Sequence, residues 1–436
     1  MKYDIGIIGA GPAGYSAAFK AAESGKSVVI FEQDKVGGTC LNRGCIPTKS
    51  LLHTSGQYSL IRKAVPDYPF DYQKALETRD NTVTQLRNGI EKMIKMKKIS
   101  LVNGHACIAD PHHIRANGED YEVDYIIIAT GSKVSLPPIP GIDSNYVITS
   151  DDLLEKNDLD FDSVTIIGGG VIGVECASIF LALDKKVTIL EIADHILPTM
   201  DPEMAQRLNM FLKKKKADIQ VKVSIRNIEG NTVNYVDARG RELSVTSDKI
   251  LVAAGRRANW ENLFTSELKL ETGRGIIADS DGRTNIENIF VAGDVKDRNI
   301  QLAHVAIAQG ENIIDIINGR KPSIDTSVIP SCIYTDPEMA SVGLSQKEAE
   351  LQGMKVTARK VLTGANGKAL IEESESGYVK VVLDENEVII GAQLICPHAT
   401  ELVSELSLCV QKKLTLSQLK EVVHPHPTVS EMIAGL

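Results

Sequence analysis

The first 35 residues alternate between apolar runs and short glycine-containing segments. An apolar run at 3–10, YDIGIIGA, is followed by the glycine segment GPAG. The next stretch, YSAAFKAAESG, is rich in small helix-forming residues, and SVVIFE at 27–32 is a second apolar run. Two apolar runs joined by a glycine turn and a helical stretch predict a strand–helix–strand unit.

A similar pattern returns about 160 residues later, in the order SVTIIGG, GVIG, VECASIFLALD and KVTILE. The proline-rich segment SLPPIPG at 135–141 lies between the two copies and is typical of a linker. The chain is therefore predicted to contain two units of the kind that binds mononucleotides.

The remaining patterns predict further strands and a separate C-terminal domain. Short strands are expected at ISLVNGHACI, HHIRAN, YEVD and YIIIATGS, which suggests a β-meander packed on the first unit. Alternation at NIEGNTVNYVDARGRELSV and the apolar run KILVAAG follow the second unit. From about residue 327, expected strands (SCIYTDPEMASVG, YVKVVLD, VIIGAQLI) mix with expected helices (TELVSELSLCVQKK, SQLKEVV), which predicts an α+β domain.

Composition narrows the possible partners. A chain of 436 residues is long enough for two to four domains. The net charge of −9 argues against binding to nucleic acid or to an anionic membrane. Residues 213–216, all lysine, are expected at the end of a helix, where cations are stabilised. No run of 18 apolar residues occurs, and the N-terminal apolar run contains glycines unlike a signal peptide, so we expect a cytoplasmic or organelle-matrix protein.

The first glycine segment, Gly9-Ala10-Gly11-Pro12-Ala13-Gly14, has the spacing of a dinucleotide-binding fingerprint. Its first glycine permits a tight turn, its second lets the backbone approach a pyrophosphate, and its third lets helix and strand pack closely. Glu32 lies eighteen residues after Gly14, at the end of the next strand, where a carboxylate can bind both ribose hydroxyls.

The second fingerprint is Gly168-Gly169-Gly170-Val171-Ile172-Gly173, and Glu191 follows eighteen residues later. A carboxylate at that position repels a 2′-phosphate, so this site is expected to prefer NAD over NADP. Two dinucleotides in one chain indicate electron transfer between them. The alternative is that one fingerprint is a decayed duplicate.

The seven cysteines divide into a close pair and five scattered residues. Cys107, Cys176, Cys332, Cys396 and Cys409 lie among apolar or strand-like neighbours, as expected of structural thiols in a reducing compartment.

The close pair is Cys40 and Cys45. On an ideal helix their Cα atoms would lie roughly 8–9 Å apart, beyond the disulfide limit of about 7 Å. Gly44 and Pro47 can supply the necessary distortion. The spacing alone also allows two unrelated helix cysteines.

The segment GGTCLNRGCIPTKSLL resembles the redox-active segment of the pyridine nucleotide-disulfide oxidoreductases, and especially of the dihydrolipoamide dehydrogenases. IIIATGS, LVAAGRRAN, TNIENIFVAGDV and QLAHVA are similar to further segments of that family. The resemblance implies FAD at the first site, NAD at the second, and a ribityl contact from Asp294. It also implies that Lys49 and Glu175 meet near the flavin.

The resemblance implies an α/β fold of glutathione-reductase-like architecture, with two Rossmann-like domains and a C-terminal α+β dimerisation domain. The expected boundaries are 1–145 and 258–325 for the two parts of the FAD-binding domain, 146–257 for the NAD-binding domain, and 326–436 for the dimerisation domain.

The C-terminal segment HPHPTVSE at 424–431 resembles the HxHPTxSE signature of dihydrolipoamide dehydrogenases. The resemblance implies that His426 is the catalytic base, that Glu431 orients it, and that both face the cysteines of the partner in a homodimer. Histidine suits this role because its pKa lies near neutral pH. Thr428 to Glu431 also fits a helix capping box, which is the structural alternative.

The expected reaction is oxidation of protein-bound dihydrolipoamide, in which Cys40 faces the dithiol, Cys45 faces FAD, and NAD⁺ is reduced. The expected partners are a second copy and the lipoyl-bearing proteins of 2-oxoacid dehydrogenase or glycine cleavage complexes, with no metal site. The alternatives are a related disulfide reductase or a non-catalytic flavoprotein subunit. The residues expected to contact the cofactors are Gly9, Gly11, Pro12, Ala13, Gly14, Glu32, Gly38, Thr39, Lys49, Ala106, Thr130, Gly131, Ser132, Gly168, Gly170, Val171, Ile172, Gly173, Glu175, Glu191, Val223, Gly255, Asp294, Gln301, Leu302, Ala303 and His304.

Overall fold

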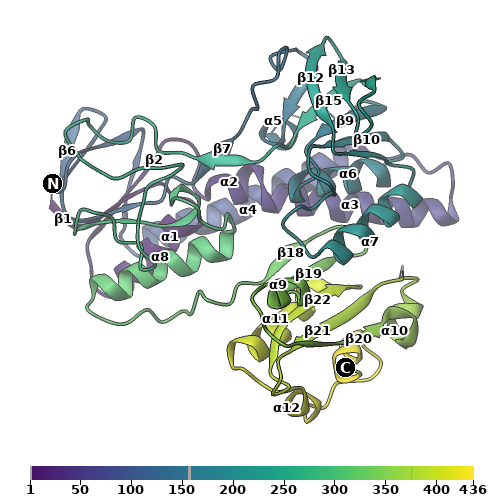
Figure 1. Ribbon diagram of the computed structural model, residues 1–436. Helices are drawn as coiled ribbons and strands as arrows, with labels where there is room; N and C mark the ends of the chain where they lie inside the picture. The colour runs from purple at the N-terminus through teal and green to yellow at the C-terminus, as the bar shows by residue number, and fades with distance from the viewer. Residues whose placement is uncertain (1, 156–158, 375) are drawn as a thin grey trace.

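The computed structural model describes residues 2–155, 159–374 and 376–436. Figure 1 shows two α/β units side by side in the upper part of the view and a C-terminal domain below them. Within these ranges, none of the helices combines the length and apolar character needed to span a membrane.

The first unit is built on a seven-stranded sheet of order β3-β2-β1-β6-β5-β4, in which β17 also pairs with β6. The strands β1, β2 and β3 and the end of β6 run parallel, and β2 is buried along its whole length, as in sheets covered on both faces. The strands are β1 (Lys2–Ile8), β2 (Val28–Glu32), β3 (Ser100–Asn103), β4 (Ala106–Asp110), β5 (His113–Ala116), β6 (Glu119–Ile128) and β17 (Ile289–Val291).

The strand β6 differs from the sequence prediction. We expected YEVD and YIIIATGS as two separate short strands, and this is wrong. The two segments form one ten-residue strand, which pairs with β5 in antiparallel fashion at its start and with β17 in parallel at its end. The first half of β6 is alternately buried and belongs to the antiparallel part of the sheet. Its second half is buried and belongs to the parallel part. The expected meander is present as β4, β5 and the start of β6, and its side chains pack on the first unit.

The helices α1, α4 and α8 pack on one face of the first sheet, and the other face is covered by β4, β5 and residues 260–270. The helix α1 packs against α8, and α3 forms a hairpin with α4. Alanines of α1 meet the apolar side of α8 in one buried cluster with β1 and β2. The helices are α1 (Pro12–Glu23), α2 (Gly38–Arg43), α3 (Cys45–Ala64), α4 (Tyr72–Met96) and α8 (Ala303–Ile317), and a 3₁₀ turn, η1 (Gly293–Val295), precedes α8.

The second unit contains a parallel sheet of order β11-β10-β9-β15-β8 and a three-stranded antiparallel sheet, β12-β13-β14. The run of lysines falls at the end of α7, as expected: Lys213 and Lys214 lie in its last turn. The elements are β8 (Val147–Thr149), α5 (Ser150–Glu155), β9 (Ser163–Ile167), α6 (Val171–Ala182), β10 (Lys186–Glu191), α7 (Pro202–Lys214), β11 (Asp218–Val221), β12 (Ser224–Glu229), β13 (Thr232–Val236), β14 (Glu242–Thr246) and β15 (Lys249–Val252).

Two chain segments cross between the units side by side. The strand β7 (Ser132–Val134) leaves the first unit, and β16 (Arg256–Ala258) returns to it. They form a two-stranded antiparallel ribbon, which Figure 1 shows between the two units. This pairing joins the units at one place, and the packing of α3 on α6 joins them at another.

The C-terminal domain has an antiparallel sheet of order β18-β19-β22-β21-β20. The predicted single strand SCIYTDPEMASVG is wrong, because the chain turns back within it and Ser331 pairs with Ser341 across two strands. The elements are β18 (Ser331–Ile333), β19 (Met339–Gly343), α9 (Gln346–Leu351), β20 (Thr357–Leu362), η2 (Thr363–Ala365), α10 (Gly367–Ile371), β21 (Tyr378–Leu383), β22 (Ile389–Ile395), α11 (Ala399–Gln411), α12 (Leu416–Lys420) and α13 (Glu431–Ala434).

Candidate active site

A single cavity of about 1800 Å³ lies between the first and second units. The strands β1 and β9 end at it, and the glycine segments that follow them, with Gly9 and Gly168, line it. Cys40 and Cys45 line the same space. Clefts at the carboxyl ends of parallel strands are the usual place for dinucleotides.

The first glycine segment forms a compact cradle. Gly9 has a φ of 103°, a conformation that favours glycine, and a Cβ on Gly14 would lie 1.9 Å from the Gly9 carbonyl oxygen. The helix α1 begins at Pro12 with no side-chain cap at Gly11, so its first backbone N–H groups remain available to an anion.

Glu32 is buried at the end of β2. Its Oε2 accepts a hydrogen bond from Ala10 N at 2.8 Å and its Oε1 accepts one from Asp34 N at 2.9 Å. Burial raises the pKa of this carboxyl. The contacts hold the carboxylate against the glycine turn, where a ribose would lie.

The second segment repeats this construction. Gly168 has a φ of 109°, and a Cβ on Gly173 would lie 2.0 Å from its carbonyl oxygen. Glu191 accepts hydrogen bonds from Gly169 N at 2.6 Å and from Ala193 N at 2.7 Å. Both cradles therefore have the glycine geometry and the carboxylate that a dinucleotide requires, and the residues present fit two such cofactors.

The cysteine pair lies where one helix ends and the next begins. Cys40 is in α2, Gly44 separates the helices, and Cys45 is the first residue of α3. A Cβ on Gly44 would lie 2.9 Å from the Thr39 carbonyl oxygen and 3.2 Å from the Cys40 Cα. The break at Gly44 explains how this spacing escapes the geometry of an ideal helix.

Cys40 and Cys45 are free, half-buried thiols in this structure. Their pKa values are shifted in opposite directions. A hydrogen bond from the Cys40 thiol lowers the pKa of Cys45, Lys49 lowers it further against the effect of burial, and the result is about 7. The same hydrogen bond, together with burial, raises the pKa of Cys40. Cys45 is therefore the thiol of the reduced pair that ionises first as the pH rises.

Lys49 and Glu175 meet beside the pair. Lys49 Nζ lies 2.8 Å from Glu175 Oε2, and Tyr334 N donates to Glu175 Oε1 at 3.0 Å. Lys49 Nζ also lies 4.5 Å from the centre of the Tyr334 ring. The lysine charge is thus held close to Cys45, which accounts for its part in lowering the pKa of that thiol.

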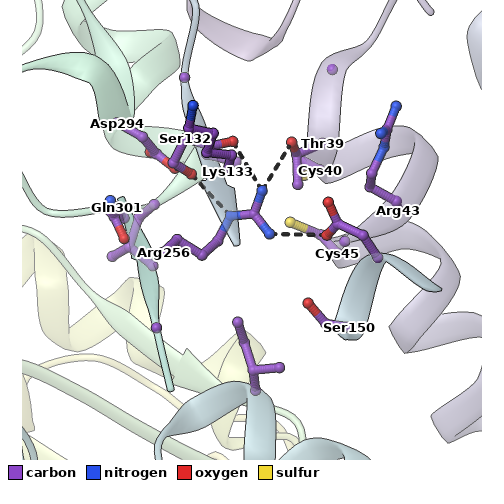
Figure 2. Close-up of a pocket in the computed structure, with 18 of the residues that line it drawn as sticks. Thr39, Cys40, Arg43, Cys45, Ser132, Lys133, Ser150, Arg256, Asp294 and Gln301 are labelled. Carbon is purple, nitrogen blue, oxygen red and sulfur yellow. Dashed lines mark hydrogen bonds and ion pairs between the residues drawn. The ribbon is translucent and has the colours of Figure 1, made fainter. Parts of the chain in front are cut away.

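Asp294 is positioned by a short chain of hydrogen bonds. Ser132 Oγ donates to Asp294 Oδ2 at 2.7 Å, and Arg256 Nε donates to Ser132 Oγ at 2.9 Å. Burial raises the pKa of Asp294. Figure 2 shows these side chains together with Thr39 and Cys45 around one space.

The structure places the predicted residues in two locations. All the residues expected to contact a cofactor line the cavity except Gly14 and Gly173, which lie behind their glycine turns. His426 and Glu431 do not line it. The contacts themselves remain predictions.

The sequence prediction missed several residues of the cavity wall, among them Arg43, Asp151, Arg256 and Tyr334. Two had a usable signal, because Arg256 follows Gly255 in LVAAGRRAN and Arg43 lies between the cysteines. Asp151 and Tyr334 had none, since their position depends on how distant elements pack.

His426 and Glu431 form a pair in the C-terminal domain, outside the cavity. His426 Nδ1 lies 2.9 Å from Glu431 Oε1, and the His426 side chain is 80% exposed. Glu431 Oε2 also accepts from Thr428 N at 3.0 Å, as a capping box requires. However, α13 has Ser430 as its N-cap, and Thr428 Oγ1 donates to Pro425 O, so Thr428 is not the cap. One carboxylate oxygen of Glu431 therefore contacts the imidazole, while the other accepts a hydrogen bond from the backbone.

Comparison with known families decides the class of protein. The model described as pyridine nucleotide-disulphide oxidoreductase matches residues 3–310, and the model of the dimerisation domain of these enzymes matches residues 329–436. The chain belongs to the pyridine nucleotide-disulphide oxidoreductase family. It is an FAD-dependent enzyme of this family that uses NAD(H), and it carries the family's dimerisation domain.

Among its relatives in this family are several bacterial proteins named dihydrolipoyl dehydrogenase. The protein of Chlamydia pneumoniae is 38% identical, with 100% of this chain and 96% of the relative covered. The protein of Bacillus subtilis is 34% identical, with 99% and 96% covered.

Solved structures of the family share the fold. The HOCl-induced flavoprotein disulfide reductase RclA from Escherichia coli has a TM-score of 0.90 and 28% identity, with 100% of this chain and 99% of that chain covered. This likeness confirms the predicted architecture of a glutathione-reductase-like disulfide reductase.

The low pKa of Cys45 gives a first prediction for this oxidoreductase. Because the folded pKa lies below that of an ordinary thiol, Cys45 of the reduced enzyme is expected to become alkylated by iodoacetamide with a pH midpoint of about 7. Lys49→Met is expected to move this midpoint upward. Peptide mass spectrometry of the alkylated protein measures both, and the prediction is wrong if the midpoint stays the same in the variant.

Proposed function

We propose that this enzyme oxidises dihydrolipoamide carried on a protein and reduces NAD⁺, as a dihydrolipoyl dehydrogenase. The observation that carries the proposal is the single cavity lined by both glycine cradles and by the cysteine pair. Full-length similarity to proteins named dihydrolipoyl dehydrogenase supports the choice of substrate.

The proposed chemistry starts with Cys40 and Cys45 joined as a disulfide. A substrate thiolate attacks the Cys40 sulfur, the Cys40–Cys45 bond breaks, and Cys45 leaves as a thiolate. The second substrate thiol, once deprotonated, attacks the sulfur bonded to Cys40, which releases cyclic lipoamide and leaves both cysteines reduced. The low pKa of Cys45 favours its role as leaving group.

We assign FAD to the first cradle and NAD to the second. FAD, when bound, passes the electron pair of the reduced cysteines to NAD⁺. Glu32 and Glu191 would hold ribose hydroxyls, the N–H groups at the starts of α1 and α6 would face the pyrophosphates, and Asp294 would accept a ribityl hydroxyl. The boundaries that we propose for the FAD-binding, NAD-binding and dimerisation domains are those given by the sequence.

The proposed base is His426 of the partner subunit in a homodimer. The His426 side chain is largely exposed and lies outside the cavity of its own chain, so it can serve a cavity only across an interface. Glu431 fixes the imidazole through Nδ1, which leaves Nε2 for the substrate proton. The dimerisation domain supplies the interface.

The physiological partners in this proposal are lipoyl-bearing proteins of 2-oxoacid dehydrogenase or glycine cleavage complexes. A cytoplasmic location fits the scattered free cysteines, which suit a reducing compartment.

An assay panel tests the proposed function. Purified protein should oxidise NADH rapidly with lipoamide as acceptor, and slowly with glutathione disulfide, with Hg²⁺ or with NADPH in place of NADH. Turnover of NADPH at the rate of NADH would contradict the assignment of Glu191. Bound FAD without turnover of any disulfide would contradict the enzymatic proposal.

A second candidate is reduction of a different disulfide. It is favoured by the similarity to RclA, a protein described as an HOCl-induced flavoprotein disulfide reductase. RclA is 28% identical to this chain, whereas the Chlamydia pneumoniae protein is 38% identical, so this second function is the weaker candidate. Activity with glutathione disulfide above that with lipoamide would favour it.

The two cradles can be tested separately. Gly173→Ala places a Cβ against the Gly168 carbonyl oxygen and should leave FAD bound, while it weakens NAD⁺ binding by at least about tenfold, a loss of about 1.4 kcal/mol. Gly14→Ala should instead lose the flavin. Gly56→Ala in α3, where a Cβ meets no neighbour, is the control and should stabilise the protein by about 0.5–1 kcal/mol. Flavin absorbance and NAD⁺ titration measure the outcome, and NAD⁺ binding unchanged in Gly173→Ala would refute the assignment.

A further inference from the structure

The helix α5 (Ser150–Glu155) connects the second unit to the helix that carries Cys40. Its apolar side, Leu153 and Leu154, is buried in the core formed with β9 and α6. Its acidic side carries Asp151 and Glu155, which lie one helical turn apart and so share a face. The acidic side approaches α2, the short helix between the first cradle and Gly44.

Asp151 is linked to the start of α2 through Arg256. Arg256 Nη1 donates to Asp151 Oδ1 at 3.0 Å, and Nη2 donates to Thr39 Oγ1 at 3.5 Å. Thr39 immediately precedes Cys40. The Arg256 side chain is only 12% exposed, so its charge requires a partner of opposite sign. Figure 2 shows the guanidinium between Ser132 and Thr39.

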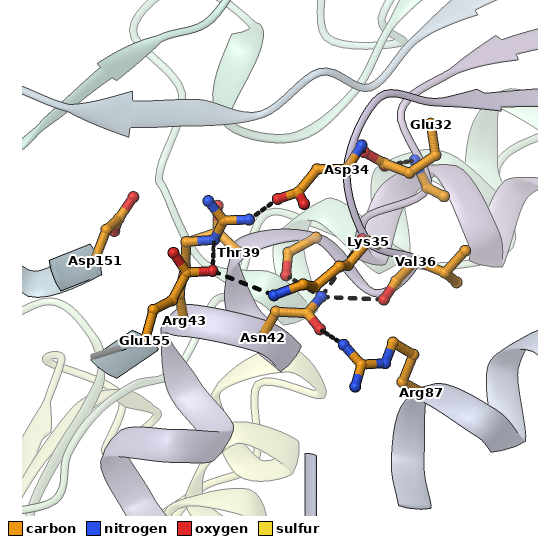
Figure 3. Close-up of polar contacts among 12 residues, drawn as sticks. Glu32, Asp34, Lys35, Val36, Thr39, Asn42, Arg43, Arg87, Asp151 and Glu155 are labelled. Atoms are coloured by element: carbon orange, nitrogen blue, oxygen red, sulfur yellow. Dashed lines mark hydrogen bonds and ion pairs between the residues drawn. The ribbon is translucent and has the colours of Figure 1, made fainter. Parts of the chain in front are cut away.

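Glu155 is linked to the end of α2 through Arg43. Arg43 Nε lies 3.5 Å from Glu155 Oε1, and the other side of the guanidinium pairs with Asp34. Lys35 Nζ approaches the same Glu155 oxygen at 3.6 Å. Arg43 precedes Gly44, where the helix breaks before Cys45. Figure 3 shows this group of charges against α2.

The opposite side of α2 is fixed to the first unit. Asn42 Nδ2 donates to Val36 O at 3.0 Å, and Arg87 Nη1 of α4 donates to Asn42 Oδ1 at 3.2 Å. Asn42 Nδ2 also donates to Gly38 O within α2 at 2.9 Å. A helix of six residues has little stability of its own. Its position therefore depends on these side-chain contacts.

We propose that Asp151 and Glu155 are positioning residues for the cysteine pair: through Arg256 and Arg43 they hold both ends of α2 and thereby fix Cys40 relative to Cys45. The inference rests on the proposed redox function of the pair. It also makes the second unit, through α5, part of the support of the redox site in the first unit.

The support should shift the redox equilibrium in a defined direction. In the exchange reaction, the enzyme S–S bond and two substrate thiols become two enzyme thiols and the S–S bond of lipoamide. The disulfide already constrains the two sulfurs, whereas the free thiols are constrained only by the surrounding contacts. Loss of the support therefore stabilises the dithiol form more than the disulfide form.

The test is a double variant, Asp151→Asn with Glu155→Gln, in the FAD-loaded enzyme. The equilibrium constant for reduction by dihydrolipoamide should rise about tenfold toward the enzyme dithiol, or about 30 mV. Equilibration in mixtures of lipoamide and dihydrolipoamide, followed by thiol trapping and mass spectrometry, measures it. Each single variant should shift the constant about threefold, and the single variants serve if the double variant does not fold.

The matched control removes two carboxylates from exposed ion pairs of β6 that do not contact α2. Asp120 pairs with Arg115 and Glu122 with Lys2, so Asp120→Asn with Glu122→Gln should leave the equilibrium constant within about twofold of the wild type.

An unchanged constant in the folded α5 variants would overturn the inference, as would an equal shift in the control. If the wild-type pair does not exchange with dihydrolipoamide at all, the proposed function itself fails, and the two failures are distinguishable.

Discussion

A heterodimer with Cys45→Ser in one subunit and His426→Gln in the other should keep about half of the wild-type activity per dimer, because twofold symmetry leaves one intact site of the two. In that site, the unaltered cysteine pair of one chain faces the unaltered histidine of the other. Each homodimeric variant should lose activity, His426→Gln on the order of 10²–10⁴-fold. Separate affinity tags on the two chains isolate the heterodimer for a lipoamide assay.

The control carries the same two substitutions in one chain, paired with a wild-type subunit. If the base acts across the interface, neither site is complete and this heterodimer should be almost inactive. If the base acted within its own chain, the wild-type subunit of the control heterodimer would be active, and the control would keep about half of the activity. The first heterodimer would then be almost inactive. That reversal would refute the intersubunit site.

Cys40→Ser and Cys45→Ser should each reduce lipoamide turnover on the order of 10⁴-fold or more, as removal of a nucleophile does in other enzymes. Both variants should still bind FAD, since Glu32 and the glycine cradle are untouched. The variants should differ in their thiols. Cys40→Ser keeps Cys45 beside Lys49, which lowers the pKa of that thiol, whereas Cys45→Ser keeps Cys40, whose pKa burial raises. Flavin absorbance, lipoamide assays and alkylation profiles measure these outcomes.

Cys107→Ser provides the control for these substitutions. Cys107 is half-buried in β4 and does not line the cavity, so its removal should leave turnover unchanged. Full activity in either variant of the close pair would contradict the mechanism, whatever the behaviour of Cys107.

The sequence predicted those parts of the site that depend on local chain geometry. Gly9, Gly14 and Glu32 lie within one strand–helix–strand unit, so their spacing along the chain determines their spacing in the fold. The same holds for Gly168, Gly173 and Glu191. The redox segment was predicted from its resemblance to a known family, because the spacing of Cys40 and Cys45 alone also allowed two unrelated cysteines.

Contacts between distant segments were not predicted from local patterns, and the contact of Lys49 with Glu175 was expected only through the family resemblance. Asp151 and Arg256 are more than a hundred residues apart in the chain and are brought together by the side-by-side crossing of β7 and β16 near α5. No local pattern distinguishes Asp151 from an ordinary surface carboxylate. Their partnership follows from packing alone.

The errors in strand assignment have a similar cause. The first half of β6 has an alternating apolar pattern and the second half a continuous one, and each half was predicted as a separate strand. A single strand can have both patterns when its first half is partly exposed and its second half is buried. In SCIYTDPEMASVG, the polar residues between β18 and β19 were included in a single strand, but they form the turn that reverses the chain.

The placement of β17 has a consequence for the order of folding during synthesis. Ile289–Val291 completes the first sheet beside β6, yet it is made after every strand of the second unit. While the ribosome is still adding those residues, the edge of β6 at Ile126–Ile128 has no neighbour in that position. The second unit, whose strands are contiguous in the chain, can close first, although nascent chains generally fold their N-terminal domain first. Flavin capture should therefore be a late event, one that waits for emergence of residues beyond Asp294.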